Sequence, residues 1–293
     1  MKHVILAGGS GFLGTAITNV LLGRGFRVTC ISRSGRAPKG AVALRWSDDV
    51  SQAVASAHAV VNLAGANVGA RRWTAAYQRE ILTSRIDATR TLAKAIRSVE
   101  CPPALINASA VGFYGDTTVD VNEGHPAGAT FLATVTQRWE AETDVLRDVT
   151  RVALMRIGVV LDPMEGALAK LLGPIKMGLG GPLGSGRQWF PWIHRDDVVQ
   201  AFLWAIDGNA SGPYNLVAPQ QVTMAEFVHA VGSVVHRPTV FGVPSGLLRL
   251  LLGAQADVVL HGQRVRPFRL EGDGFTWAYP RLIPALQHLL HGS

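Results

Sequence analysis

The chain has 293 residues, of which 48% are hydrophobic and 17% are charged, so it can bury a large core in one domain or in two closely packed ones. Its net charge of +7 does not indicate a nucleic-acid-binding protein. Residues 1–47 hold seven of the 28 Lys and Arg residues and none of the 21 acidic ones, so the charges in the rest of the chain balance. Because no broad basic stripe with interleaved aromatic residues is present, we expect no nucleic-acid partner.

The first element is a short apolar segment, residues 4–7, which predicts a buried strand. A glycine turn follows it at once, and residues 15–22 then have the pattern of a helix. This order places backbone N–H groups and a helix N-terminus where a pyrophosphate binds in dinucleotide-binding folds. The turn runs Gly8-Gly9-Ser10-Gly11-Phe12-Leu13-Gly14, and its glycines at three-residue spacing allow a tight turn and a close approach of the backbone to phosphate.

The second predicted strand, residues 27–31, decides which dinucleotide the turn favours. NAD-binding folds usually have an acidic residue about 20 residues beyond the glycines, where it binds the ribose hydroxyls. Here the first acidic residue of the chain is Asp48, and Ser32 and Arg33 follow the strand, with Arg36 and Lys39 close behind. Cationic side chains at this place favour a 2′-phosphate, so the sequence predicts NADP(H) as the cofactor.

Strands and helices continue to alternate up to residue 165. Apolar segments at 59–65, 104–108 and 152–160 predict further buried strands, and periodic segments at 73–99 and 131–147 predict helices. This alternation indicates an α/β fold with a doubly wound, Rossmann-type parallel sheet covered by helices on both faces.

We expect two parts in the chain. Residues 1–165 form the predicted NADP(H)-binding domain, with segments near 190–220 returning to it. Residues 166–293 mainly form a smaller, α-rich substrate lobe that packs closely against it.

In a doubly wound sheet, ligands bind outside the carboxyl ends of the strands. That rule brings together the glycine turn, the segment around Arg33 and three further strand ends. Those three are Asn62-Leu63-Ala64-Gly65, the segment from Ser109 to Tyr114, and the segment that contains Val159 and Val160.

These motifs resemble those of the short-chain dehydrogenase/reductase superfamily, in its extended, epimerase-like branch. More narrowly, the chain resembles the atypical subfamily of "epimerase family proteins", also described as similar to nucleoside-diphosphate-sugar epimerases. The narrower likeness rests on Arg71-Arg72-Trp73, on the glycine-rich segment 178–186 and on the tail 243–290. The resemblance covers nearly the whole chain and implies NADP(H) binding by a Rossmann-type domain with a C-terminal substrate lobe.

The resemblance also implies roles for single residues. Ser32 and Arg33 are expected to hold the adenosine phosphate, and Asn62 and Leu63 to run along the adenosine side of the cofactor. Glu80 and Arg85, on the long predicted helix, match positions that contact the cofactor in the subfamily. Val159 or Val160 is expected near the nicotinamide.

One departure concerns catalysis. The superfamily normally uses a Tyr followed four residues later by a Lys, which lowers the pKa of the phenol. None of the four tyrosines here has such a Lys, and Thr134 and Arg138 stand at the expected place. Ser109 and Tyr114 are then the candidates for polarising a carbonyl and passing a proton, or else they belong to a structural turn at the end of a strand.

The sequence therefore predicts an NADP(H)-dependent oxidoreductase that acts on a small, unidentified substrate and needs no metal. The alternatives are a nucleotide-sugar epimerase with tightly held cofactor and a non-catalytic NADP(H) sensor. Because the N-terminal residues form the first strand and no apolar run is long enough to span a bilayer, we expect a cytoplasmic protein without a membrane partner. By analogy with extended members of the superfamily, a homodimer is possible.

Overall fold

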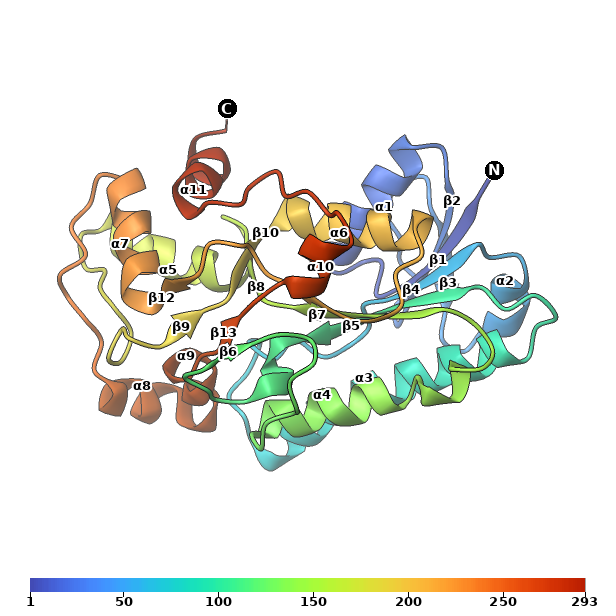
Figure 1. The fold of residues 1–293 in the computed structure, drawn as a ribbon, viewed down its shortest axis with the longest axis horizontal. Helices are drawn as coiled ribbons and strands as arrows, with labels where there is room; N and C mark the ends of the chain where they lie inside the picture. The colour runs from blue at the N-terminus through green and yellow to red at the C-terminus, as the bar shows by residue number, and fades with distance from the viewer. Residues whose placement is uncertain (293) are drawn as a thin grey trace.

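The computed structural model describes residues 1–292 and is built around one parallel sheet of seven strands. The strands lie in the order β3-β2-β1-β4-β5-β7-β11 (Figure 1). This order, with the first strand central and the chain wound outward on both sides, confirms the Rossmann-type prediction. The bounds are β1 His3–Ala7, β2 Arg27–Ser32, β3 Val42–Arg45, β4 Ala59–Asn62, β5 Ala104–Ala110, β7 Val152–Ile157 and β11 Gly212–Leu216.

Helices cover both faces of the sheet. In Figure 1, α1 (Phe12–Gly23) and α6 (Arg195–Asp207) lie above it, and α3 (Ala75–Arg97) and α4 (Phe131–Ala141) lie below it. The short helix α2 (Val50–Ala55) packs against α3. Because both faces are covered, the central strands are mostly apolar, and β1 is buried at every position.

Two predicted elements end differently in the structure. The helix expected over 131–147 ends at Ala141 and is followed by a single 3₁₀ turn, Asp144–Leu146. In that turn, Leu146 is buried in the core beside α3. The strand expected over 152–160 breaks at Gly158 into β7 and β8 (Val159–Leu161). There β8 leaves the main sheet and pairs in parallel with β10 (Trp192–His194).

The C-terminal region has a core of its own, and most of the region lies at the left of Figure 1. Its helix of residues 268–272 lies near the centre and packs against β11. Its helices are α5 (Gly166–Lys176), α7 (Met224–Val234), α8 (Ser245–Leu252), α9 (Asp257–Leu260), α10 (Phe268–Gly272) and α11 (Leu282–His291). Two small strand pairs complete it, β9 (Trp189–Phe190) with β12 (Val222–Thr223), and β13 (Arg264–Val265) with β6 (Asp120–Val121). Thr223 and Glu226 form a capping box at the start of α7.

The division at residue 165 stays a prediction. Segments on both sides of this residue contribute to the main sheet, since β11 pairs with β7 and α6 packs on β5 and β7. Among the helices within residues 1–292, we find none whose length and apolarity would let it cross a membrane.

Candidate cofactor and active site

The glycine turn holds β1 and α1 unusually close together. Gly8 has a φ of +81°, in the left-handed region that favours glycine. A Cβ on Gly14 would lie 2.2 Å from the carbonyl oxygen of Gly8, so the helix can approach the turn only because residue 14 is glycine. A Cβ on Gly9 would likewise meet the Sγ of buried Cys30, at 2.4 Å.

The N-terminus of α1 is free to bind an anion. Gly11 is the N-cap residue and has no side chain to accept a hydrogen bond from the first turn. Phe12 and Leu13 begin the helix and are half-buried. Free N–H groups at the positive end of a helix dipole, next to a backbone cradle, fit the pyrophosphate of a dinucleotide.

Cationic side chains gather where β2 and β3 end. The hydroxyl of Ser32 accepts a hydrogen bond from the N–H of Arg36 and donates one to its carbonyl, both at 2.9 Å. This tight turn leaves the side chains of Arg33 and Arg36 exposed. Arg45, at the end of β3, lies against Gly35, where a Cβ would be 2.8 Å from its Nε. The three guanidinium groups belong to one turn and its neighbouring strand, which fits the expected phosphate site.

At the end of β4, Asn62 is buried and acts as a framework residue. Its amide nitrogen donates to the Thr89 hydroxyl at 2.9 Å and to the Asn107 side-chain oxygen at 2.7 Å. Its own side-chain oxygen accepts from the backbone N–H of Ala64 at 3.1 Å. These bonds fix the path of residues 62–65, so Asn62 shapes the backbone along which we expect the adenosine side of the cofactor. Leu63 follows it, with its side chain packed against the core.

Arg85 is a mostly buried cation beside this backbone. Its guanidinium lies against Gly65, where a Cβ would be 3.0 Å from Cζ, and it donates to the carbonyl of Ile81 at 2.9 Å. Burial lowers its pKa to about 10. Within residues 1–292 no carboxylate pairs with it, so a bound anion would complete its environment. Glu80 is half-exposed and lies 3.9 Å from Arg71.

Ser109 and Tyr114 belong to one buried polar network. Ser109 donates its hydroxyl proton to Glu140, and Glu140 forms a two-point ion pair with Arg156 at 2.9 and 2.8 Å. Arg156 in turn donates to the Tyr114 hydroxyl at 3.0 Å, and Tyr114 donates to the side-chain oxygen of Asn215 at 2.7 Å. Both candidate catalytic hydroxyls therefore have protein partners already.

The electrostatics of this network keep Arg156 charged and Tyr114 neutral. Burial alone would lower the pKa of Arg156, but the hydrogen bonds and charge of Glu140 raise it. Burial raises the pKa of the Tyr114 phenol, and the charge of Arg156 opposes that only in part. Thr134 bonds to the carbonyl of Thr130 and Arg138 is exposed, so neither reproduces the missing Tyr–Lys pair.

The segment expected near the nicotinamide is fixed to the C-terminal region. The N–H of Val159 donates to the carbonyl of Pro191 at 2.7 Å, and Val160 pairs with Ile193. Gly158 allows this close approach of β8 to Pro191, because a Cβ on residue 158 would lie 2.3 Å from the Pro191 oxygen. Val159 and Val160 are half-buried.

Comparisons with known proteins identify the family of the chain. Residues 4–136 match the NAD dependent epimerase/dehydratase family, and residues 243–289 match a domain of unknown function. The mouse epimerase family protein SDR39U1 is 39% identical over 295 residues, 98% of this chain and 99% of the relative. The chain belongs to the epimerase/dehydratase family.

Two solved structures of relatives are similar over the whole chain. The human epimerase family protein SDR39U1, crystallised with NADPH, is 36% identical with a TM-score of 0.91 and is covered completely, as is this chain. A nucleoside-diphosphate sugar epimerase from Corynebacterium glutamicum is 30% identical with a TM-score of 0.81, over 99% of this chain and 58% of that one. The resemblance inferred from the motifs is thereby confirmed.

The sequence did not single out several residues that this family member brings to the site. Arg45 is one, and its place depends on the register in which β3 pairs with β2, with Ser32 opposite Arg45, which the sequence does not fix. Glu140, Arg156 and Asn215 are others. They lie on three different elements, so no local spacing connects them with Ser109 or Tyr114.

Proposed function

We propose that the chain binds NADP(H) and uses it to interconvert a small carbonyl compound and its alcohol. The observation that carries the cofactor assignment is the pairing of the glycine cradle with three exposed arginines, Arg33, Arg36 and Arg45, at the ends of the next strands. Guanidinium groups bind phosphate in a two-point geometry, and no carboxylate within residues 27–47 competes for the ribose hydroxyls. The NADPH in the human relative's crystal structure supports the same assignment.

In this proposal the protein contributes positioning and charge. The helix N-terminus at Phe12 and Leu13 and the buried guanidinium of Arg85 hold the diphosphate, and Val159 and Val160 flank the nicotinamide. When bound, the cofactor supplies a hydride for the carbonyl carbon, and the resulting alkoxide requires a proton. The Tyr114 hydroxyl is the proton donor we propose, with Arg156 stabilising the phenolate that forms. Ser109 acts on Arg156 through Glu140 as a positioning residue, since its own proton is already donated.

The engaged hydroxyls also favour a second candidate function. Tyr114 must leave Asn215 before it can protonate a substrate, and its raised pKa makes it a weak acid. A protein that binds NADPH as a sensor needs no such proton donor. The two functions differ in redox turnover, because a sensor binds NADPH without consuming it in the presence of carbonyl compounds.

A titration tests the cofactor assignment. We expect NADPH to bind more tightly than NADH, and Arg33→Ala to weaken NADPH by about tenfold or more while leaving NADH nearly unchanged, the loss expected for one hydrogen bond to a charged group. Arg147→Ala is a matched control, because that arginine forms an exposed pair with Asp144 in the turn that precedes β7, at the amino end of the strands. Equal affinities for the two dinucleotides would contradict the assignment.

A further inference from the structure

The C-terminal region exposes apolar side chains on neighbouring segments. More than half of the large hydrophobic side chains that are exposed within residues 1–292 lie between residues 177 and 258. Single exposed hydrophobic residues are common, whereas a group of neighbours marks a surface that contacts a protein or a membrane. Six of these side chains form what we call the apolar ridge: Leu179, Val240, Phe241, Leu247, Leu250 and Leu251.

Helix α8 carries half of the apolar ridge. Leu247, Leu250 and Leu251 share one face of the helix, because residues three and four apart are neighbours on a helix surface. All residues from 245 to 251 are exposed except Leu248, and Leu250 is 73% exposed. In Figure 1, α8 lies at the lower left, at the edge of the molecule. A surface helix normally turns its apolar face to the core, so an apolar face turned to solvent indicates contact with a partner.

The other members of the apolar ridge adjoin α8 along the chain. The N–H of Phe241 donates to the carbonyl of Gly180 at 3.0 Å, so Leu179 lies next to the segment that holds Phe241. Helix α8 begins four residues after Phe241. Figure 1 shows this stretch of chain descending the left edge of the molecule from α7 to α8. The ridge therefore follows one edge of the C-terminal region.

The charges beside the apolar ridge are positive. Residues 166–195 and 227–256, which include the whole ridge, hold six Lys and Arg residues and no Asp or Glu. Lys176 and Arg237 are exposed, and each stands three residues before a member of the ridge. The Nε of Arg237 donates to the backbone carbonyl of Lys176 at 3.0 Å, so the two lie together. Within residues 1–292, neither side chain forms an ion pair.

The acidic residues at the two ends of the segment 227–256 already have partners. Asp257 pairs with Arg249 at 3.1 Å. Glu226 accepts hydrogen bonds from the N–H and the hydroxyl of Thr223 in the capping box of α7. Neither acid neutralises the cations next to Leu179, so the charge beside the ridge complements an anionic partner.

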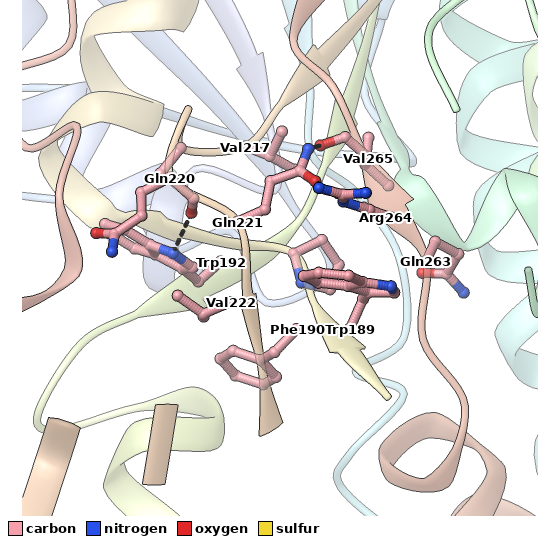
Figure 2. Close-up of a pocket in the computed structure, with 12 residues that line it drawn as sticks. Trp189, Phe190, Trp192, Val217, Gln220, Gln221, Val222, Gln263, Arg264 and Val265 are labelled. Carbon is pink, nitrogen blue, oxygen red and sulfur yellow. Dashed lines mark hydrogen bonds between the residues drawn. The ribbon is translucent and has the colours of Figure 1, made fainter. Parts of the chain in front are cut away.

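The interior of the C-terminal region offers such a partner no place. Figure 2 shows the hollow between residues 189–192, 217–222 and 263–265, which has room for about 10 Å³, the size of about one water molecule. Its one ionisable side chain, Arg264, lies over the Trp189 ring and pairs with Asp120 at 2.9 Å. A partner of this region therefore binds on the outer surface.

We propose that the apolar ridge docks on the surface of an anionic lipid bilayer. The leucines of α8 and Phe241 enter the boundary between headgroups and acyl chains, and Lys176 and Arg237 lie at the lipid phosphates. Apolar side chains beside cations suit such a surface, because the burial of apolar area and the attraction to anionic lipids add together. The expectation of no membrane partner rested on the absence of a spanning segment, which a contact with the bilayer surface does not need.

A second copy of the chain is a less favourable partner for the apolar ridge. Two copies usually pair about a two-fold axis, which places the same surface of each against the other. Lys176 and Arg237 of one copy would then approach those of the other, and like charges oppose such a contact. A bilayer with anionic headgroups supplies the opposite charge.

Flotation of the full chain with lipid vesicles tests the proposal. One set of vesicles contains phosphatidylcholine and phosphatidylglycerol in equal parts, and the other contains phosphatidylcholine alone. We expect binding to the anionic vesicles to be at least about tenfold tighter. Leu250→Ser/Leu251→Ser should weaken that binding by about tenfold or more, because two apolar side chains no longer enter the bilayer. Lys176→Gln/Arg237→Gln should reduce the preference for anionic vesicles to about threefold or less.

Matched controls come from the turn that precedes β7. Val145→Ser removes an exposed apolar side chain and Arg147→Gln removes an exposed cation, and neither should change vesicle binding. Far-UV circular dichroism shows whether each variant is folded. Absent binding to anionic vesicles, equal binding to both kinds of vesicle, or ridge variants that bind as the wild type does would each overturn the proposal. A dimer that light scattering detects and that Leu250→Ser/Leu251→Ser abolishes, without vesicle binding, would assign the ridge to a second copy instead.

Discussion

The buried ion pair between Glu140 and Arg156 makes a strong prediction about stability. Their side chains are only 10% and 5% exposed, and the pair joins α4 to β7 beneath the candidate site. Glu140→Gln leaves the Arg156 cation buried without a counter-charge. Removing one partner of a buried pair typically costs about 3–5 kcal/mol, because the remaining charge has lost both water and its partner.

The measurement is urea unfolding followed by circular dichroism. The slope of the unfolding free energy against urea concentration should be the same for all variants. Asp144→Asn is the matched control, since its pair with Arg147 is 51% and 74% exposed and should contribute less than about 1 kcal/mol. In the double variant Glu140→Gln/Arg156→Met, the unpaired charge is gone, so the loss should be smaller than the sum of the two single losses by more than about 1 kcal/mol.

The reasoning would be refuted by a Glu140→Gln protein as stable as the Asp144→Asn control, or by additive losses in the double variant. Either result would mean that Arg156 finds water or another acceptor. Methionine suits the comparison because it is uncharged and its thioether can pack on the Phe113 ring, over which the Arg156 guanidinium lies 3.5 Å from the ring centre.

Three further predictions concern single positions. Gly14→Ala should abolish NADPH binding in a fluorescence titration, because its Cβ would overlap the Gly8 oxygen. The control is Gly173→Ala on α5, where a Cβ meets nothing within 4 Å. This variant should bind NADPH normally, and its free energy of unfolding should rise by about 0.5–1 kcal/mol. Burial raises the pKa of Asp197 to about 6, so its contribution to stability is present below pH 4 and is lost as pH rises through 6. Relative to Asp197→Asn, the wild type should therefore lose up to about 3 kcal/mol between pH 4 and pH 6.5 in urea unfolding, and a flat difference would exclude the shift. Thr223→Ala removes the capping box of α7 and should cost about 1 kcal/mol by the same assay, with no change in NADPH affinity.

Much of the fold could be predicted because its signals are local. The inner strands β1, β2 and β4 are mostly buried and are recognised as short apolar segments, and the glycine turn has a required spacing. The predicted strand at 27–31 differs from β2 by one residue. The break at Gly158 could not be predicted, since it depends on the approach of Pro191, more than 30 residues further along the chain.

The candidate site was predicted only in part for the same reason. Backbone positions such as Gly8 and Gly14 follow from the motif, and so does the cationic turn at Arg33. The partners of Ser109 and Tyr114 are contributed by distant elements, and residue spacing carries no signal of their contact. The sequence left open whether these hydroxyls are catalytic or belong to a structural turn. The network is consistent with both roles of Tyr114, because its bond to Asn215 stabilises the fold and its contact with Arg156 would stabilise a phenolate.

The late position of β11 in the chain has a consequence for synthesis on the ribosome. Until residue 216 has emerged, β7 is an unprotected edge strand and the surface that α6 covers is exposed. A nascent or truncated chain that stops near residue 165 would thus expose the unpaired backbone N–H and C=O groups of β7, which can pair with another chain. We expect such a fragment to aggregate. The edge of the sheet is covered only when β11 pairs with β7, and β11 is translated long after the glycine turn.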